Sequence, residues 1–589
     1  MHNVSASPRD YWRLLADYLK PQGGRAALLA LLLLSGTGLQ LVSPLVLREF
    51  IDRALEGEPL RVLLFIAGLF IGFAILIQAI KLFETWTAEY VGWTATNNLR
   101  ADLARHVLDL DMSFHNQHTP GALIERVDGD VFLLGNFFSR FIINILGNLL
   151  LTIGVIVVLA RIDMRIGLAI GLFAVLTIVT MIVFGRFTAP RFAASRQASA
   201  ELMGFLEERV GGTQDIRSTG STAYTMRRNH EFAREFYRRQ KSAVILSSFS
   251  YSSAQLLAVL GTAVSLGVGA TLYRDGDITL GTVFVIFQFT QLLVLPVEEI
   301  SRQLRDFQQA TASIGRVRAL QKIEPTITDG PGVPLPHGPL AVNFDHVTFG
   351  YGPDEPTVRD LTFHLSPGRV LGVVGRTGSG KSTITRLLCR FHDPGQGVIR
   401  LGGVDLRECA LADIRERVAL VTQEIQLFRA TVRDNLTFFD DAIPDERIVE
   451  ALGQLGLMTW YESLPDGLET MLASGGSGVS AGEAQLLAFT RVFLRDPDLV
   501  ILDEASSRLD PASEALLERA IDALFAGRTA IVIAHRLATI ERADDVLVMA
   551  DGEIVEHGDR ETLANDPSSR FAGLLRSGHE LVTSREATP

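Results

Sequence analysis

The chain has 589 residues, too many for one domain, and 47% of them are hydrophobic. Its formal net charge of −12 at pH 7 argues against nucleic acid as the main partner, because cationic surfaces bind the phosphate backbone. The two cysteines are Cys389 and Cys409. So few cysteines exclude a disulfide scaffold and suit a reducing compartment.

Residues 1–24 are predicted to form a cytoplasmic or elbow helix, and they lack the apolar core of a signal peptide. Aromatic and leucine side chains repeat there at helical spacing: Tyr11, Trp12, Leu15, Tyr18 and Leu19. Two interpretations fit this pattern equally well. The helix lies on a membrane surface with its apolar face inserted, or it packs as an ordinary helix of the fold.

Six apolar runs are long enough to cross a bilayer, which takes about 20 residues. They cover residues 26–46, 62–82, 137–160, 166–187, 244–272 and 281–300. The runs therefore predict an all-α transmembrane domain of six helices, with cytoplasmic extensions, over residues 25–322.

The connections between these runs alternate in length. The second and fourth runs are followed by long segments that read as helical throughout, so the membrane helices are expected to continue into one aqueous compartment and turn back there. The arginine-rich segment 186–241 fits the cytoplasmic side. Each long segment contains a helix-breaking turn, at residues 114–127 and 211–221, and both turns are candidates for short helices that touch another domain.

Residues 323–340 are dense in proline and glycine and are predicted to form a linker. Short β-like runs then alternate with helices over residues 341–578, which predicts an α/β domain, and residues 579–589 form a tail. The predicted fold is therefore multidomain, with an all-α six-helix transmembrane domain followed by an α/β P-loop ATPase domain.

The most specific motif is VLGVVGRTGSGKSTITRLL, residues 370–388. An apolar strand runs into the pattern Gly-x-x-x-x-Gly-Lys-Ser and then into an amphipathic helix, which is typical of a phosphate-binding P-loop. Backbone N–H groups surround the phosphates there, and the helix N-terminus adds its positive dipole end. Lys381 is expected to neutralise the β- and γ-phosphates, and Ser382 to hold Mg²⁺.

Three further apolar strands end in polar side chains. The strand in LVILDEASS ends in Asp503 and Glu504. Asp503 is a candidate to bind Mg²⁺ through water, and Glu504 is a candidate to polarise the attacking water as a general base. His535 follows a second strand and could sense the γ-phosphate, although a lone histidine is more often structural. Gln423 follows a third strand and could reach Mg²⁺, and Tyr351 offers a flat face for stacking on adenine.

These motifs, in this order and after six apolar runs, resemble the ATP-binding cassette (ABC) transporters of the exporter type. On this resemblance Tyr351 is the adenine-stacking aromatic, Gln423 the Q-loop residue, Glu504 the catalytic glutamate and His535 the switch histidine. The resemblance implies ATP and Mg²⁺ as cofactors, with the metal held by Ser382, Gln423 and Asp503. The Walker A residues implied to bind the nucleotide are Gly375, Thr377, Gly378, Ser379, Gly380, Lys381, Ser382 and Thr383.

The resemblance also implies an assembly. One such chain is half a transporter, and each ATP lies between the Walker A loop of one chain and the signature motif of a second ABC half-transporter. Two coupling helices are implied near residues 113–125 and 212–220, and the second usually reaches the partner's ATPase domain. The chain is expected to be a multi-pass protein of the inner (plasma) membrane, in contact with lipid, with its ATPase domain in the cytoplasm.

The signature motif departs from the family sequence Leu-Ser-Gly-Gly-Gln. It reads Val479, Ser480, Ala481, Gly482 and Glu483. Ser480 and Gly482 can still reach a γ-phosphate, but Ala481 adds a methyl group and Glu483 adds a negative charge. Two like unit charges about 6 Å apart, at an effective dielectric constant of about 20, repel by on the order of 3 kcal/mol.

Ser474, upstream of the signature, and Arg508, in the D-loop, also differ from the family pattern. These changes affect the surface offered to the partner's nucleotide, whereas this chain's own Walker motifs are intact. Family heterodimers with one competent and one degenerate ATP site show the same asymmetry, which favours a heterodimer here. A homodimer that tolerates a variant signature is the alternative.

The function implied is ATP hydrolysis coupled to transport, most simply export of an amphipathic or lipid-like small molecule, as in multidrug exporters. An importer of exporter fold, such as a siderophore transporter, is one alternative. An ATP-gated channel is another, although Glu504 and His535 count against it because a gate needs no fast hydrolysis. Polar residues within the apolar runs fit either a substrate path or hydrogen bonds between helices.

Overall fold

The computed structural model describes residues 8–136, 145–293, 296, 299, 310, 312–352, 355–473, 475, 478–503, 511–533 and 540–576. The chain divides into two compact units. The first comprises Met1–Asp109 with Thr119–Ile323, and the second comprises Leu110–His118 with Glu324–Pro589. The first unit is helical and the second is an α/β domain, which confirms the predicted fold class.

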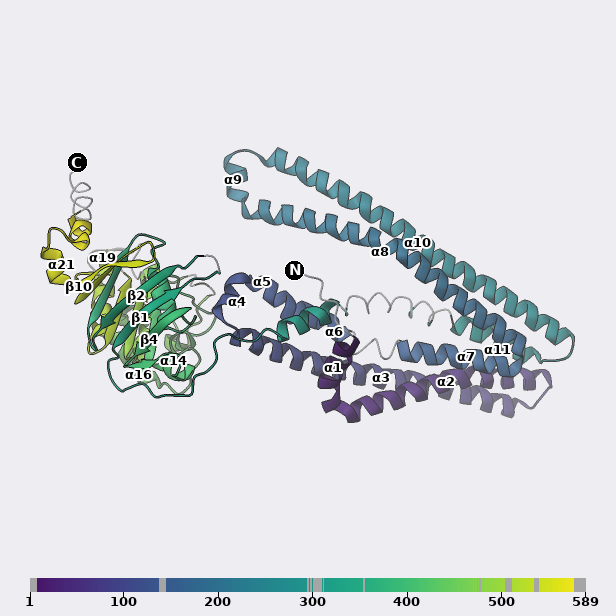
Figure 1. Ribbon diagram of the computed structural model, residues 1–589. Coiled ribbons are helices and arrows are strands. Elements are labelled where there is room, and N and C mark those ends of the chain that lie inside the picture. Colours follow the sequence, from purple (N-terminus) through teal and green to yellow (C-terminus); the bar gives the residue numbers. More distant parts are fainter. Residues whose placement is uncertain are drawn as a thin grey trace. The chain divides into compact units, whose positions relative to one another are not determined.

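The first unit consists of long helices and short helices between them (Figure 1). Five helical segments of the described residues are long and apolar enough to cross a membrane, namely Ala16–Leu55, Leu60–Asp109, Ile145–Ile162, Met164–Gly211 and Thr222–Arg274. They contain the described parts of the first five predicted spans. The sixth predicted span begins in the shorter apolar helix Leu280–Leu292, and most of its remainder lies outside the described residues.

The helices of the first unit, in chain order, are α1 (Pro8–Leu19), η1 (Lys20–Gln22), α2 (Gly23–Leu55), α3 (Leu60–Asp109), α5 (Pro120–Ile124), η2 (Glu125–Gly129), α6 (Asp130–Asn136), α7 (Asn148–Ile162), α8 (Met164–Gly211), α9 (Thr213–Ser218), α10 (Thr222–Arg274) and α11 (Leu280–Leu292).

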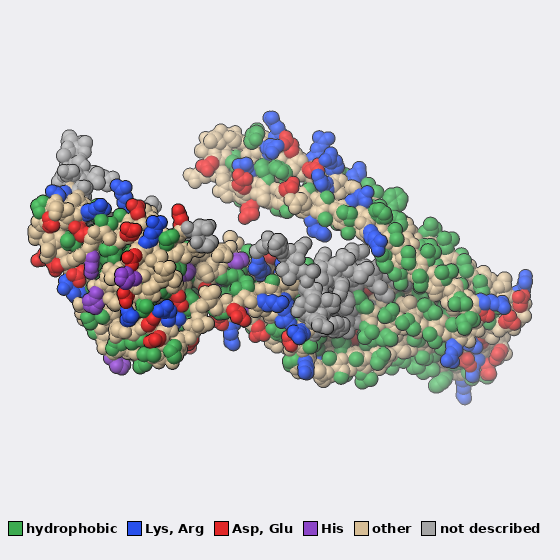
Figure 2. All heavy atoms as spheres, viewed as in Figure 1, with side chains coloured by type: hydrophobic (Ala, Val, Ile, Leu, Met, Phe, Trp, Pro, Cys, Tyr) green, Lys and Arg blue, Asp and Glu red, His purple; other side chains and the backbone are tan. Residues whose placement is uncertain are grey.

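The longest helices extend well beyond a bilayer. Helix α3 has 50 residues and α10 has 53, or about 75 to 80 Å at a rise of 1.5 Å per residue, against a hydrocarbon core of about 30 Å. Helices α8 and α10 run side by side, with α9 joining them at one end (Figure 1). Hydrophobic side chains dominate a long stretch of this pair away from α9, whereas charged side chains gather near α9 (Figure 2). The helices are therefore long enough to continue beyond a bilayer, as the predicted extensions require.

Helix α1 packs against α3 at its C-terminal end. Leu14 is fully buried. The Tyr18 hydroxyl donates to the Asp102 carboxylate at 2.9 Å, and the Gln22 amide donates to the Val91 carbonyl at 3.2 Å. Of the two interpretations left open by the sequence, these contacts support the packed helix.

A buried carboxylate joins two distant segments of the first unit. Asp130, at the start of α6, has a side chain that is 2% exposed. It accepts hydrogen bonds from the Ser313 hydroxyl at 2.9 Å, from Arg316 Nε at 2.8 Å and from Arg316 Nη2. A buried charge needs such partners, so this cluster fixes the segment around residue 313 onto α6.

The second unit contains two sheets. The strands of the four-stranded antiparallel sheet, in the order β2-β1-β4-β5, are β1 (Val342–Phe349), β2 (Val358–Leu365), β4 (Gln396–Leu401) and β5 (Val404–Asp405). The strands of the six-stranded sheet, in the order β10-β9-β3-β8-β7-β6, are β3 (Val370–Gly375), β6 (Val418–Val421), β7 (Leu499–Asp503), β8 (Thr529–Ile533), β9 (Asp545–Ala550) and β10 (Glu553–Asp559). Strands β9, β3, β8, β7 and β6 are parallel to one another.

The helices of this unit are α4 (Met112–Gln117), α13 (Lys381–Leu388), α14 (Leu411–Arg417), α15 (Val432–Thr437), α16 (Asp445–Gln454), α17 (Met458–Glu462), η4 (Gly467–Glu469), α18 (Ala481–Arg495), α19 (Pro511–Phe525) and α21 (Arg560–Asn565).

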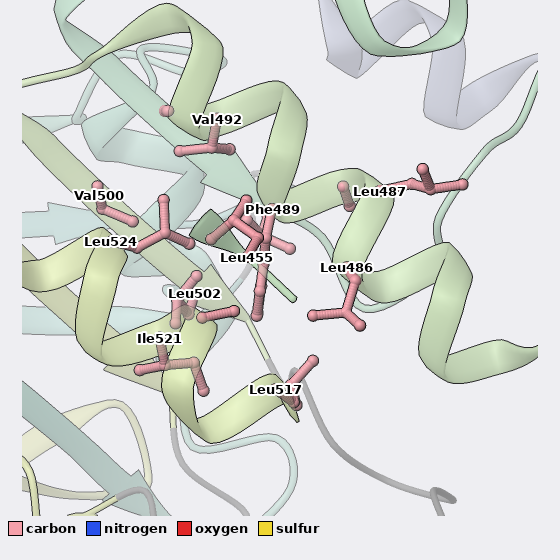
Figure 3. Close-up of a cluster of buried hydrophobic side chains, with 14 of the residues drawn as sticks. Leu455, Leu486, Leu487, Phe489, Val492, Val500, Leu502, Leu517, Ile521 and Leu524 are labelled. Carbon is pink, nitrogen blue, oxygen red and sulfur yellow. The ribbon is translucent and has the colours of Figure 1, made fainter. Parts of the chain in front are cut away.

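Continuous apolar runs make the parallel strands suitable for the centre of this domain. Every residue of β8 is buried, whereas half-buried and exposed residues alternate along the edge strand β10. Helix α18 covers one side of the sheet and places Phe489 against β7 and α19 (Figure 3). The core therefore holds the carboxyl ends of the parallel strands at fixed positions, and the predicted site residues follow those ends.

Candidate nucleotide site

The predicted P-loop connects β3 to α13. Gly378 and Gly380 have φ angles of +86° and +98°, in the left-handed region that favours glycine. A Cβ atom on Gly375 would lie 2.3 Å from the Met549 carbonyl oxygen, and one on Gly380 would lie 2.6 Å from a Val358 methyl group. The glycines of the motif are therefore required both by backbone conformation and by the close approach of β9 and β2.

Lys381 stands at the first position of α13 and is 6% exposed. Its Nζ donates to the carbonyl oxygens of Gly375 and Arg376 at 2.8 and 2.9 Å. The ammonium group at the end of the loop is thus hydrogen-bonded to the residues at its start. The Ser379 hydroxyl is buried in the same loop and has no hydrogen-bond partner among the described residues. A buried polar atom without a partner fits a loop that binds a polar ligand.

The sheet register brings further predicted residues to the same edge. Asp503, the last residue of β7, pairs with Ile533 of β8, which in turn pairs with Val373 of β3. Gln423 comes two residues after the end of β6, the next strand, and is exposed. The carboxyl ends of parallel strands are where ligands bind in open α/β sheets. Asp503 and Gln423 therefore belong to the edge that carries the P-loop.

Two predicted catalytic residues fall outside the described residues. Glu504 follows β7 directly, and His535 comes two residues after the end of β8. Ser474 and Arg508 also lie outside them.

The donor set at this edge fits Mg²⁺. The hydroxyl of Ser382, the carboxylate of Asp503 and the amide of Gln423 all offer oxygen ligands, and Mg²⁺ prefers oxygen from one or two protein groups together with phosphates. The described residues contain no cluster of three or more His, Cys, Asp or Glu side chains that would form an all-protein metal cage.

Tyr351 follows β1 and is 44% exposed. Its hydroxyl accepts a hydrogen bond from Arg386 Nη1 at 3.0 Å and lies 3.4 Å from the Thr383 hydroxyl, so the ring is attached to the P-loop helix. The ring meets Phe349 and His392 edge-on, at centroid distances of 5.1 and 5.3 Å. Tyr351 is therefore fixed in position while keeping nearly half of its surface open for stacking.

The signature segment begins helix α18 with a capping box. The Ser480 hydroxyl accepts from the Glu483 backbone N–H at 3.2 Å, and Glu483 Oε2 accepts from the Ser480 backbone N–H at 2.7 Å. The carboxylate is thus folded back on its own helix end, where it satisfies a backbone donor. The pattern Ser-x-x-Glu is a sequence signature of this arrangement, so the sequence alone could have revealed it.

Helix α4 clusters with the ATPase domain although it follows α3 of the first unit. Asp111, just before α4, accepts three hydrogen bonds from the segment leading into the domain: from Thr326 N at 2.5 Å, Thr326 Oγ1 at 2.6 Å and Ile327 N at 3.3 Å. Phe114 is buried and stacks on His118. The first predicted coupling turn, residues 113–125, is therefore shared, with α4 in the second unit and α5 in the first.

The second predicted coupling turn, residues 212–220, forms α9, which has no buried residue. A separate groove of ≈ 440 Å³ lies beside Gln426, between α14 and α18 of the ATPase domain. Its lining combines apolar side chains with arginines, including Ile414, Arg415, Phe428, Phe438, Arg491 and Arg495. Burial lowers the pKa of Arg491 to about 10, which still leaves this guanidinium charged at neutral pH.

Comparisons with known proteins cover most of the chain. Residues 27–297 match the family described as "ABC transporter transmembrane region", and residues 358–507 match that described as "ABC transporter". The fatty acid ABC transporter ATP-binding/permease protein of Mycobacterium bovis is 31% identical over 465 residues, which are 79% of this chain and 74% of that protein.

Two further proteins are similar over nearly their whole length. The ATP-dependent lipid A-core flippase of Sodalis glossinidius is 29% identical over 94% of this chain and 95% of that protein. The solved structure of a bacterial Atm1-family ABC exporter with ATP bound has a TM-score of 0.79 at 22% identity, covering 97% of this chain and 99% of that one. The P-loop geometry, the helical transmembrane unit and these matches lead to one assignment: the chain belongs to the ABC transporter family, as a multi-pass half-transporter of exporter fold whose cytoplasmic ATPase domain drives transport by hydrolysing ATP.

Proposed function

We propose that this chain is one subunit of a dimeric exporter that moves an amphipathic or lipid-like small molecule across the membrane. The names of two relatives support this substrate class, since one is called a fatty acid transporter and another a lipid A-core flippase. Direct uptake into inside-out vesicles that contain the purified transporter tests both substrate and direction. Accumulation of a fluorescent lipid or fatty acid with ATP supports export, whereas ATP-driven loss from such vesicles supports an importer.

The observation that carries the ATPase proposal is the P-loop, where Lys381 is held across the loop and the Ser379 hydroxyl finds no hydrogen-bond partner among the residues that the structure describes. In this proposal Lys381 and the backbone N–H groups of residues 375–383 bind the phosphates, and Tyr351 stacks on adenine. Mg²⁺, held by Ser382 and Asp503 with Gln423, supplies charge neutralisation on the phosphates. Glu504 accepts a proton from the attacking water, and His535 orients that water.

Two variants separate binding from hydrolysis. Glu504→Gln removes the base but leaves the phosphate-binding loop, so ATP binding is expected to persist while turnover falls at least about 100-fold. Lys381→Ala is expected to weaken ATP binding itself. Turnover of the Glu504→Gln variant close to that of the unmodified protein would remove Glu504 from its role.

We further propose a heterodimer with a second ABC half-transporter. This chain's signature would complete the partner's ATP site, where the Glu483 charge lowers nucleotide affinity, and the partner's signature would complete the site of Lys381. The capping box refines this argument, because Glu483 can replace the family glutamine in it. The change therefore concerns charge rather than helix geometry. A chain that purifies alone as an active homodimer would contradict this proposal.

In the same proposed dimer, α4 and α9 act as the coupling helices. Helix α4 would transmit movement to this chain's own ATPase domain, and α9 would dock on the partner's domain. The groove between α14 and α18 is suited to receive a short helix from the partner, because apolar side chains and arginines line it together. The exposed helix α9 carries the half-buried Ile216 beside Asp215. Ile216→Asp should uncouple transport from ATP hydrolysis, and unchanged coupling would count against docking by α9.

A further inference from the structure

Helix α3 carries two charged side chains at a depth where its neighbour α2 carries none. Residues 26–47 of α2 contain no charged side chain, and this run measures about 33 Å, close to a hydrocarbon core of about 30 Å. Gly36 lies at the middle of the run. A Cβ atom on Gly36 would lie 3.9 Å from Oε2 of Glu84 on α3. Glu84 is therefore at bilayer depth, and Lys81 comes one helical turn before it.

Lys81 and Glu84 have no direct partner within the described part of the chain. Glu84 is half-buried and Lys81 is exposed. Neither forms a hydrogen bond or an ion pair with another residue that the structure describes. As residues i and i+3 of one helix, their Cβ atoms are about 5 to 6 Å apart. Ionisable side chains in membrane segments are rare and mark substrate or ion pathways, so this pair is a candidate binding site.

Other polar side chains of the apolar runs are already paired. The Thr290 hydroxyl of α11 donates to the Ser265 hydroxyl of α10 at 3.2 Å, and both residues are buried. Such hydrogen bonds hold membrane helices together. The sequence left two explanations open for polar residues in these runs. Helix packing fits Ser265 and Thr290, whereas a substrate path fits Lys81 and Glu84.

The polar and apolar side chains of α3 lie on different faces at this depth. Gln78, Lys81 and Thr85 are exposed and share one face, because they stand at i, i+3 and i+7. At 3.6 residues per turn, four exposed apolar side chains project about 100° to 200° away from Lys81: Ile75, Leu82, Phe83 and Trp86. The apolar face suits contact with lipid tails. The polar face is then directed away from them, as ionisable groups of membrane helices are.

We propose that Gln78, Lys81 and Glu84 form a head-group site in the transport path and select a zwitterionic lipid. Its ammonium group pairs with Glu84 and its anionic group pairs with Lys81. The inference rests on the proposed export of an amphipathic molecule and names its substrate class. A cation and an anion one turn apart match a head group whose phosphate and ammonium are joined by two carbons, as in an ethanolamine phospholipid. A purely anionic lipid would leave Glu84 unpaired at bilayer depth, which is unfavourable.

The experiment measures ATP-driven movement of lipids with different head groups. The purified dimeric transporter is reconstituted in vesicles, where added ATP reaches only the transporters whose ATPase domains face outward. Fluorescent labels are placed on the acyl chains of phosphatidylethanolamine, phosphatidylglycerol and a trimethylammonium lipid without phosphate. Protection of the label from an external quencher reports export. The unmodified protein should move phosphatidylethanolamine at least about tenfold faster than the other two lipids, because each of those loses one charge pair.

Single substitutions remove one charge at a time. Glu84→Gln should slow phosphatidylethanolamine at least about tenfold and leave phosphatidylglycerol within about twofold. Lys81→Gln should slow both phospholipids and spare the trimethylammonium lipid. Glu84→Asp conserves the charge and should keep the preference for phosphatidylethanolamine. Glu49→Gln is the matched control on α2, where it removes an exposed ion pair with Arg53, and it should change no preference.

The outcomes separate this inference from the proposed function. If the unmodified transporter protects none of the lipids, the proposed export fails and the inference fails with it. If it moves lipid without preferring phosphatidylethanolamine, the head-group site alone is refuted. The same holds if Glu84→Gln and Lys81→Gln slow all lipids equally, because a structural defect does not discriminate between head groups. If Glu84→Gln fails to fold, the head-group preference of Lys81→Gln decides.

Discussion

Glu483 has two separable effects, and two substitutions distinguish them. Glu483→Gln keeps an oxygen acceptor for the Ser480 N–H and removes the charge, whereas Glu483→Ala removes both. The bond from Ser480 N to Glu483 Oε2 measures 2.7 Å, and such a bond contributes about 0.5 to 1.5 kcal/mol net. The charge at the helix N-terminus adds about 0.3 to 1 kcal/mol. Glu483→Ala should therefore destabilise the first turn of α18 by about 1 to 2 kcal/mol.

Hydrogen exchange of the full-length transporter measures this local effect. A loss of about 1 to 2 kcal/mol corresponds to about 5- to 30-fold faster exchange of amides in the first turn of α18. Glu483→Gln keeps the capping bond, so exchange should stay within about threefold of the unmodified protein. Ser480→Ala, which removes the other half of the box, serves as the positive control.

Nucleotide affinity measures the effect of the charge. In the proposed heterodimer, the repulsion at the partner's site is on the order of 3 kcal/mol before screening, and solvent screening lowers it by about half or more. Glu483→Gln should therefore slow nucleotide release from one site of the ATP-bound dimer by about tenfold, and Glu483→Ala should gain less because its helix end frays. Equal exchange in the two variants, or release from both sites unchanged in Glu483→Gln, would refute the division into a capping role and a charge effect.

Three further predictions concern other parts of the chain. Gly380→Ala should lower ATP affinity at least about tenfold by equilibrium binding, because φ is +98° and the added Cβ would lie 2.6 Å from Val358. Asp130→Asn should destabilise the helical unit by about 1 to 3 kcal/mol in thermal unfolding, because it removes the buried negative charge that pairs with Arg316. The Arg316 side chain is half exposed, so solvent limits the loss. Gly281→Ala should impair assembly of α11 on α2, seen as a loss of monodisperse protein, because its Cβ would lie 2.5 Å from the Asp52 carboxylate.

Local patterns were sufficient for the long helices and the P-loop. The apolar runs and the scarcity of helix breakers predict α8 and α10, although α8 contains Pro190. The spacing of Gly375, Gly380 and Lys381 is itself the signature of the loop. Such features depend on residues close together in sequence, so a single sequence reveals them.

Features that depend on distant residues were not predictable in the same way. Helix α4 belongs to the ATPase unit because Asp111 bonds Thr326 and Ile327, more than 200 residues away. No local pattern predicts that His392 is buried with its ring against Tyr351, because the two residues are distant in sequence. The capping role of Glu483 is an exception, because the local pattern Ser-x-x-Glu predicts it, whereas a comparison with the family consensus does not.

In the proposed heterodimer, the capping box limits what the variant signature can change. A substitution that broke the start of α18 would misplace Ser480 and Gly482, and the partner's nucleotide would lose its contacts altogether. Here the helix end is closed by two hydrogen bonds within the motif, so Ser480 and Gly482, which are proposed to reach the partner's γ-phosphate, keep their backbone support. On this proposal the remaining penalty is electrostatic, and the positive end of the helix dipole offsets part of it. A site of this kind would bind nucleotide with reduced affinity and retain the shape needed to close. An asymmetric dimer needs that combination in its slower site, since both ATPase domains must still come together around two nucleotides.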